Sequence, residues 1–284
     1  MLVDAHCHIF TPRIVENVRS KPDMVDALKL DTVGAWERLS PEALQRSAES
    51  NRLSVCVLLP TAGPDKVRSE NDRFIGIAER FPRLRTLATL HPDMKGVDEE
   101  IRRMCEADIR GFKFSSFSQR FDPASPRVQR MLAMVESLGQ DRGALPVCVL
   151  DTFAGGGTYF RADPDHLTTP AKLAELVRTH QGINFVAAHM GGLLADFDEV
   201  RRSLPPARNL YLDTANAAHT LERDQFITLL RIHGAAHMLF GTDWPWFVHA
   251  TEVPKIAELL ARAGYSPAEQ AEVFGKNAAR LFGL

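Results

Sequence analysis

The sequence predicts an α/β protein of the (β/α)8 TIM-barrel class, built as a single domain over residues 1–284. Eight short apolar segments alternate along the chain with amphipathic helical patterns, an order typical of parallel βαβ units. The chain length of 284 residues is close to the roughly 250 residues typical of such a barrel. A doubly wound open sheet is the alternative, but its usual marker, a GxGxxG motif after the first strand, is absent.

The strands and helices are expected in strict alternation. In chain order, the expected strands cover residues 3–10, 53–60, 84–91, 111–116, 146–151, 184–190, 210–214 and 238–243. The expected helices cover residues 40–51, 69–81, 97–107, 125–139, 169–182, 196–204, 222–234 and 266–284. Two long irregular segments, 11–39 and 152–168, follow the first and fifth strands. In a barrel, both would lie on the catalytic face.

Composition excludes several classes of partner. The formal net charge is −2 and Lys and Arg form no long block, so we expect no nucleic-acid partner. No run approaches the ~18 apolar residues of a membrane span, and the first residues lack the layout of a signal peptide. The four cysteines are scattered without metal-ligand spacing, which fits a reducing cytoplasm. We therefore expect a cytoplasmic protein with a small-molecule substrate, and a homodimer is the one protein partner we allow for.

Polar residues gather at the carboxyl ends of the expected strands, where the active sites of (β/α)8 barrels lie. These residues are His6, His8, His91, Lys113, Ser115, Asp151, His189, Asp213 and Asp243. Because the set collects at one end of the strands, it indicates a site on one face of the barrel.

His6 and His8 form a candidate pair of metal ligands. Side chains two residues apart on a strand point to the same face, so both imidazoles can reach one cation. Catalytic zinc sites use three protein ligands, and His nitrogen and carboxylate oxygen are common donors. Asp243 ends the eighth strand, which neighbours the first in a closed barrel, whereas His189 enters from the sixth strand. Taken alone, however, His6 and His8 fit two histidines at the edge of a sheet equally well.

Several motifs together resemble a known family. They are "DAHCHIF" (4–10), "AHMGG" (188–192), "LFGTDWP" (239–245), "KNAARLFGL" (276–284) and, more loosely, "IRGFKF" (109–114). In this order they are similar to the motifs of the amidohydrolase-2 branch of the amidohydrolase superfamily, which includes aminocarboxymuconate-semialdehyde decarboxylase-like proteins. The resemblance covers nearly the whole chain.

The resemblance implies a (β/α)8 barrel with one divalent metal ion, usually Zn²⁺. It implies that His6 and His8 are ligands, that Asp243 is a ligand or base, and that His189 is a ligand or a catalytic imidazole. Reactions in this branch include hydrolysis of amides and lactones and non-oxidative decarboxylation of unsaturated or aromatic carboxylates.

The chain departs from the branch pattern at the fifth strand. Many members carry a histidine ligand there, but here the run is "LPVCVLDTF" (145–153). Strand alternation places Asp151 on the same face as Val147 and Val149, so Asp151 is the only candidate to replace the histidine as a metal ligand. A carboxylate would make the site richer in oxygen and favour Mn²⁺ or Fe²⁺. Asp151 could equally contact the substrate.

Three further residues are candidates for substrate contact. Lys113 should point into the barrel, where it either pairs with an acid such as Asp213 or binds a substrate carboxylate, because an unpaired buried ammonium is costly. Trp244, with Trp246, could line an apolar pocket wall, although ordinary packing explains it as well. Arg161 lies in the long loop after the fifth strand. Cys7 should point away from His6 and His8, so we exclude it as a ligand or nucleophile.

These observations favour a metal-dependent hydrolase of a small, anionic amide or lactone. In this hypothesis the cation activates a water, Asp243 takes its proton, and His189 stabilises the oxyanion or protonates the leaving group. A non-oxidative decarboxylase on the same scaffold is the alternative. A lactone hydrolase that needs no metal and a barrel that binds ligands without catalysis also remain open.

Overall fold

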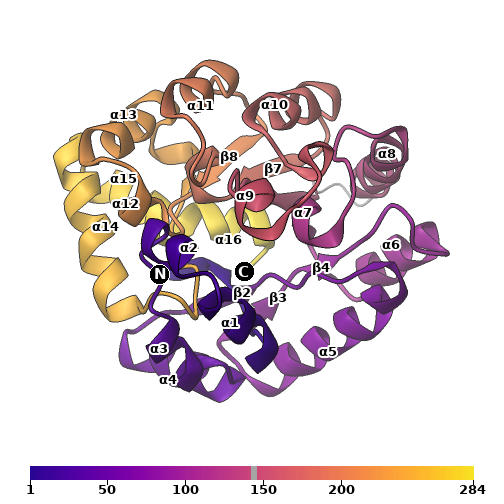
Figure 1. The fold of residues 1–284 in the computed structure, drawn as a ribbon, viewed down its shortest axis with the longest axis horizontal. Helices are drawn as coiled ribbons and strands as arrows, with labels where there is room; N and C mark the ends of the chain where they lie inside the picture. Colours follow the sequence, from indigo (N-terminus) through magenta and orange to yellow (C-terminus); the bar gives the residue numbers. More distant parts are fainter. Residues whose placement is uncertain (142–145) are drawn as a thin grey trace.

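The eight expected strand regions all form parallel strands of one barrel, and the third is split in two. The structure is a computed structural model that describes residues 1–141 and 146–284. The strands are β1 (Val3–Cys7), β2 (Val55–Leu58), β3 (Leu84–Thr86), β4 (Ala88–Thr89), β5 (Gly111–Phe114), β6 (Val147–Leu150), β7 (Asn184–Ala187), β8 (Leu210–Asp213) and β9 (Met238–Leu239). Figure 1 shows them inside a ring of helices. The predicted (β/α)8 class is confirmed.

Hydrogen bonds close the ring of strands. The strands pair in the orders β1-β2-β3 and β4-β5-β6-β7-β8-β9. The chain after β9 then runs beside β1, where the amide of Ala5 donates to the carbonyl of Phe240 (2.9 Å) and that of His8 to the carbonyl of Trp244 (2.8 Å). This closure places the end of the last strand directly beside His6 and His8.

Alternate strand residues fill the barrel interior. Val3, Ala5, Val147 and Val149 belong to one buried cluster, whereas Cys148 packs in the layer between strands and helices. The cluster also contains side chains of the last helix, which closes the barrel at the end opposite the catalytic face. The strand alternation predicted for the fifth strand is therefore correct.

The outer helices begin at capped positions. Ser40 and Thr169 each accept a hydrogen bond from a backbone amide of the first turn, and proline occupies the first helical position after both. The outer ring comprises α4 (Pro41–Ser50), α5 (Val67–Arg80), α6 (Val97–Glu106), α8 (Pro126–Asp141), α10 (Pro170–Thr179), α11 (Phe197–Ser203), α13 (Arg223–His233) and α14 (His249–Ala263). The sequence analysis missed α14, which carries Pro254 in its interior, a position where proline normally breaks a helix.

The last expected helix is divided. Its segment forms α15 (Pro267–Ala271) and α16 (Asn277–Phe282), joined by a wider turn over residues 272–276. Ser266 and Glu269 form a reciprocal capping box at the start of α15. Among the described residues, none of the helices combines the length and apolar character that a membrane span needs.

Short helices cover the catalytic face. They are α1 (Pro12–Arg19), α2 (Pro22–Ala27) and α3 (Thr32–Ala35) after β1, α7 (Ser116–Gln119) after β5, α9 (Gly156–Phe160) after β6 and α12 (Ala217–Thr220) after β8. Val18 and Met24 from the first segment pack with Phe153 and Trp246 in one apolar cluster. The two long segments that the sequence placed on this face therefore form its cover.

Candidate active site and metal centre

A bulge in β1 aims the two histidines at the mouth of the barrel. Val3 and Ala5 face the interior, so strict alternation would turn His6 and His8 outward. The pairing with β2 shifts register between Asp4 and Cys7, and this irregularity returns both imidazoles to the inside. Cys7 packs outward against the helices, as predicted.

Three donor atoms converge at this point. The Nε2 atoms of His6 and His8 lie 3.1 Å apart. The Oδ1 atom of Asp243 is 3.8 Å from Nε2 of His6 and 3.6 Å from Nε2 of His8. Donors at ~2.0–2.2 Å from one zinc ion lie at about such separations from each other. The triad therefore has the geometry of a three-ligand metal site with an open position.

Backbone geometry brings the last strand close enough to complete the triad. A Cβ added at Gly241 would lie 2.8 Å from Cβ of His6, so only glycine permits this approach. Asp243 itself has a left-handed backbone (φ 64°), as do His189 (φ 56°) and Asn216 (φ 56°). Non-glycine residues in this region are strained, and such strain collects at functional sites.

The second nitrogen of each histidine is tied, which turns Nε2 toward the site. Nδ1 of His6 donates to Oδ2 of Asp213 (2.8 Å), and Nδ1 of His8 donates to the carbonyl of Leu59 (3.1 Å). Nδ1 of His189 lies 2.9 Å from the carbonyl of Ala215. These anchors fix the tautomer in which Nε2 carries a free lone pair, the arrangement found around metal-bound histidines.

Asp213 has a role that the sequence analysis did not assign to it. Its Oδ2 holds His6, while its Oδ1 accepts from the backbone amides of His189 (2.8 Å) and Ala215 (3.1 Å). One carboxylate therefore positions two of the candidate site histidines. Its place at a strand end was visible in the sequence, but the direction of its side chain was not.

Asp151 lines the same pocket from the end of β6. Its Oδ2 accepts from the hydroxyl of Ser115 (2.9 Å) and its Oδ1 from the amide of Phe153 (2.9 Å). Oδ1 also lies 4.0 Å from Nε2 of His189. Burial raises the pKa of this carboxyl, but the charges of Lys113 and His189 and the two hydrogen bonds outweigh it, so the pKa falls below its usual value. Asp151 is therefore ionised.

The expected ion pair between Lys113 and Asp213 is wrong. Lys113 is buried, and within the described part of the chain its Nζ has no hydrogen-bond partner. Burial lowers the pKa of its ammonium, and the nearby charges of Asp151, Asp213 and Asp243 act in the opposite direction. Asp213 instead accepts from His6 and from the backbone amides of His189 and Ala215.

The buried charges at the barrel mouth do not balance. Burial lowers the pKa of His6 and His8 well below the usual range, so both are neutral. Three carboxyl groups, those of Asp151, Asp213 and Asp243, then face the ammonium of Lys113, and burial raises the pKa of two of them, Asp213 and Asp243. Burial raises the pKa of Asp243 to about 7, as expected where negative charge lacks compensation. A divalent cation is the group that would neutralise this set.

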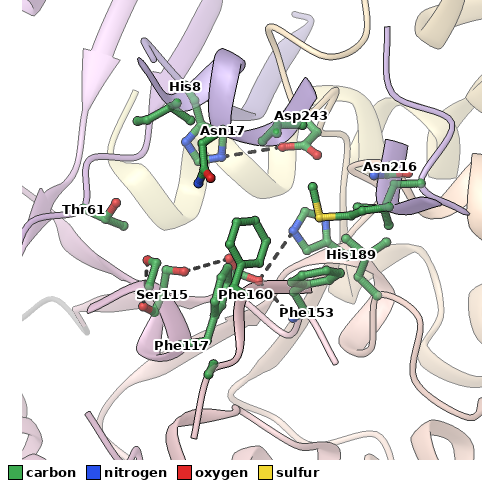
Figure 2. A pocket seen from close by; sticks show the side chains of 18 of the residues that line it. His8, Asn17, Thr61, Ser115, Phe117, Phe153, Phe160, His189, Asn216 and Asp243 are labelled. Atoms are coloured by element: carbon green, nitrogen blue, oxygen red, sulfur yellow. Dashed lines mark hydrogen bonds and ion pairs between the residues drawn. The ribbon is translucent and has the colours of Figure 1, made fainter. Parts of the chain in front are cut away.

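A cavity of about 680 Å³ opens above the triad. Aromatic rings form much of its wall (Phe10, Phe117, Phe153, Phe160 and Trp246), and basic side chains stand around it (Lys113, Arg120, Arg161 and His166). Figure 2 shows the rings of Phe117, Phe153 and Phe160 gathered opposite His8 and Asp243. Arg161, from the loop after the fifth strand, lines this cavity.

Trp244 does not line this cavity, in contrast to one reading of the sequence. Its backbone pairs with Cys7, and since Asp243 points inward, the next side chain points outward. Its ring stacks on His249 (5.5 Å between centroids). Trp246 lines the cavity instead.

Asn216 is a cavity residue that the sequence analysis missed. Its side chain is 1% exposed, and neither atom of its amide has a hydrogen-bond partner among the described residues. Buried amides without partners are rare in proteins. No sequence pattern points to Asn216, because what brings it into the cavity is a left-handed backbone conformation, which the sequence does not show.

Comparison with known proteins identifies the family. The family model described as "Amidohydrolase" matches residues 3–284. The chain belongs to the amidohydrolase family. The resemblance carried by the sequence motifs is therefore confirmed. A search of curated protein sequences found none that matches this amidohydrolase.

Solved structures share its fold at low sequence identity. A probable 2-pyrone-4,6-dicarboxylic acid hydrolase from Acinetobacter baumannii is 14% identical, with a TM-score of 0.67 over 100% of this chain and 99% of that chain. A 5-carboxyvanillate decarboxylase from Novosphingobium aromaticivorans, complexed with manganese, is 13% identical (TM-score 0.71, 100% and 96%). A 2,6-dihydroxybenzoate decarboxylase is 18% identical (TM-score 0.67, 100% and 99%).

Proposed function

We propose that this amidohydrolase is a metal-dependent hydrolase of a small ring-containing carboxylate that carries a lactone or amide bond. The observation that supports it most is the convergence of the Nε2 atoms of His6 and His8 with Oδ1 of Asp243. A divalent cation held there would lower the pKa of a water and polarise a carbonyl. Zn²⁺ is the ion we expect; Mn²⁺ or Fe²⁺ is the alternative if Asp151 adds an oxygen donor.

The surrounding residues supply the proton transfers that hydrolysis needs. Asp243 is buried and has a raised pKa, so its carboxylate is suited to accept a proton from water in the cavity. His189 holds its Nδ1 proton toward the carbonyl of Ala215, so Nε2 is the nitrogen that can exchange a proton with groups in the cavity. The carboxylate of Asp151, 4.0 Å away, would stabilise the form of His189 that has also taken up a proton from solvent at Nε2. That proton can pass to the leaving oxygen or nitrogen, and the proton that Asp243 accepts from water then returns to solvent.

The cavity favours a flat anionic substrate. The aromatic walls provide stacking surfaces for a ring, and the volume of about 680 Å³ lies within the range of small-molecule sites. Lys113 is a buried cation beside the triad, and a substrate carboxylate would give its Nζ the partner that the described residues do not. Arg161 at the rim would add attraction for a second negative group. The hydrolase from Acinetobacter baumannii is named for a ring dicarboxylate, which agrees with this substrate class.

Non-oxidative decarboxylation is the second candidate. The largely aromatic wall around Lys113 and the triad would strip water from a bound aromatic carboxylate, and loss of that hydration favours release of CO₂. Two of the structurally similar proteins are named as decarboxylases of aromatic acids. In this case the cation and Lys113 would hold the substrate, and Asp243 or His189 would deliver the proton.

The two reactions are distinguished by their products. Protein stripped of metal by a chelator and reloaded with Zn²⁺ or Mn²⁺ is assayed on ring carboxylates with a lactone or amide bond and on aromatic carboxylates. Ring opening or amide cleavage without CO₂ supports the hydrolase, whereas CO₂ release supports the decarboxylase. Activity that persists at full level without metal would contradict both metal-dependent proposals.

Variants test the metal ligands in the same assay. His6→Ala should lose activity and one equivalent of metal. His237→Ala is the matched control, because His237 contacts the carbonyl of Leu210 at the opposite end of the barrel, and it should retain both. A protein that binds ring carboxylates but turns over none of them would instead be a ligand-binding barrel.

A further inference from the structure

A second cluster of metal-ligand types lies on the other side of β1, and it includes Cys7, which the sequence analysis excluded as a ligand. It consists of the thiols of Cys7 and Cys56 and the imidazole of His249, which come from β1, β2 and α14. All three side chains are buried, with 0% exposed area, and their donor atoms lie within 4.8 Å of one another. The bulge that turns His6 and His8 inward leaves Asp4 and Cys7 both facing outward, into this cluster.

The distances within the cluster fit a tetrahedral zinc site. Sγ of Cys56 lies 3.8 Å from Nε2 of His249, close to the separation of two donors that share a zinc ion at ~2.3 Å and ~2.1 Å. Oδ2 of Asp4 lies 3.0 Å from the same nitrogen. Asp4 uses its Oδ1 for the backbone amides of His6 and Thr242. Its Oδ2 accepts from the hydroxyl of Thr242 and from Nε2 of His249, so it would bind a cation in exchange for the imidazole proton. Two sulfurs and one nitrogen thus surround one point, and the carboxylate of Asp4 borders it beside His249.

The imidazole is held in the orientation that ligation requires. Nδ1 of His249 lies 2.8 Å from the hydroxyl of Ser47, which can accept its proton, while Nε2 donates to Oδ2 of Asp4. Release of the Nε2 proton would leave a lone pair facing the thiols. The ring is also stacked on Trp244, with an angle of 16° between the planes. Little rearrangement would therefore be needed when a cation binds.

We propose that Cys7, Cys56 and His249, with Asp4 as the fourth donor, form a structural Zn²⁺ site separate from the catalytic centre. Thiolate and imidazole ligands select zinc among the common divalent cations of the cell, and full burial with four protein donors is typical of closed structural sites. Binding releases the protons of the two thiols and of the imidazole, since each ligand must be deprotonated. The ion would clamp β1, β2 and α14 together behind the bulge that aims His6 and His8.

The test removes two candidate ligands of the catalytic centre and measures how much zinc the protein still binds. The His6→Ala/His8→Ala double variant, expressed without chelators, should hold about one equivalent of zinc. After exchange with Co²⁺, it should show the near-ultraviolet charge-transfer band of a cobalt–thiolate bond. His249→Gln or Cys56→Ser, added to the double variant, should lose the zinc and the band. Cys148→Ser is the matched control, because Cys148 is a buried cysteine outside this cluster, and it should keep both.

The outcome also separates this proposal from the catalytic one. One zinc in the double variant and one in the wild type would support the cysteine site and contradict the catalytic site. A double variant that holds no zinc and shows no thiolate band after addition of Co²⁺ would overturn the cysteine site. The four side chains would then be a hydrogen-bonded cluster of Asp4, His249 and two thiols. If the third substitution prevents folding, the Co²⁺ spectrum of the folded double variant decides alone.

Discussion

Replacing Asp213 by asparagine should weaken binding of the catalytic metal ion, because it moves one proton of His6 from Nδ1 to Nε2. The new side chain can keep its Oδ1 on the backbone amides of His189 and Ala215, the contacts that Asp213 now makes at 2.8 and 3.1 Å. Its NH₂ group must then face Nδ1 of His6, where the carboxylate now accepts at 2.8 Å. Since an amide NH₂ only donates, His6 would have to accept at Nδ1 and carry its proton on Nε2, the atom that should bind the cation.

The expected loss follows from the cost of reversing that tautomer. Restoring the lone pair on Nε2 places two donors against each other in a buried site, which costs about 1–3 kcal/mol. The affinity for the cation should therefore fall by about 10- to 100-fold, and kcat should fall with the metal occupancy. The fold should persist, because the backbone contacts remain.

Calorimetric titration of metal-free protein with Zn²⁺ or Mn²⁺ measures this affinity directly. Asp163→Asn is the control: it removes the same charge from a residue that lines the cavity but contacts no site histidine, and it should bind the cation as the wild type does. An Asp213→Asn variant with wild-type affinity would refute the proposed orientation of His6.

Three other predictions follow from particular side chains. Trp244→Ala should lower the free energy of unfolding by about 3–5 kcal/mol without changing KM, whereas Trp246→Ala should raise KM; equal effects on KM would contradict the placement of the two rings. Burial and the charge of a neighbouring histidine lower the pKa of His233 to about 4. As the pH falls from 6.5 to 4, the unfolded chain therefore binds a proton at His233 before the folded chain does, and the free energy of unfolding should fall by up to about 3 kcal/mol. In urea unfolding, the His233→Leu variant should lose that part of the pH dependence. An unchanged pH profile in this variant would contradict the assignment to His233. Asn216→Gly keeps the left-handed backbone and removes an amide without partners among the described residues, so it should weaken substrate binding with no loss of stability. Asn209→Ala is the control and should lower the free energy of unfolding, because the Asn209 amide donates to three backbone carbonyls. If Asn216→Gly also lowers it, Asn216 has a structural role.

Local patterns in the sequence were sufficient to predict the barrel. Alternating apolar strands and amphipathic helices determine a parallel sheet closed by helices, and the carboxyl ends of its strands can be located from the pattern alone. The inward direction of Asp151 followed from the alternation of Val147 and Val149, because β6 is regular. Residues on regular strands could thus be placed without a structure.

The missed features depend on irregular backbone. His6 and His8 lie together at the barrel mouth as expected, but the bulge that turns them inward was missed, because simple alternation does not contain it. Asn216 enters the cavity through a left-handed backbone conformation. For Trp244 the sequence left a cavity wall and ordinary packing open, and the structure shows packing against His249. The contact of Asp213 with His6 joins residues 207 positions apart. Such contacts arise from the closure of the barrel, which no local pattern encodes.

The most direct test of the central claim is an anomalous diffraction measurement on crystals grown with Mn²⁺. The account predicts one strong peak about 2.1–2.2 Å from the Nε2 atoms of His6 and His8 and from a carboxylate oxygen of Asp243. Absence of a peak at this point, in crystals whose protein is active on its substrate, would contradict the metal-dependent mechanism.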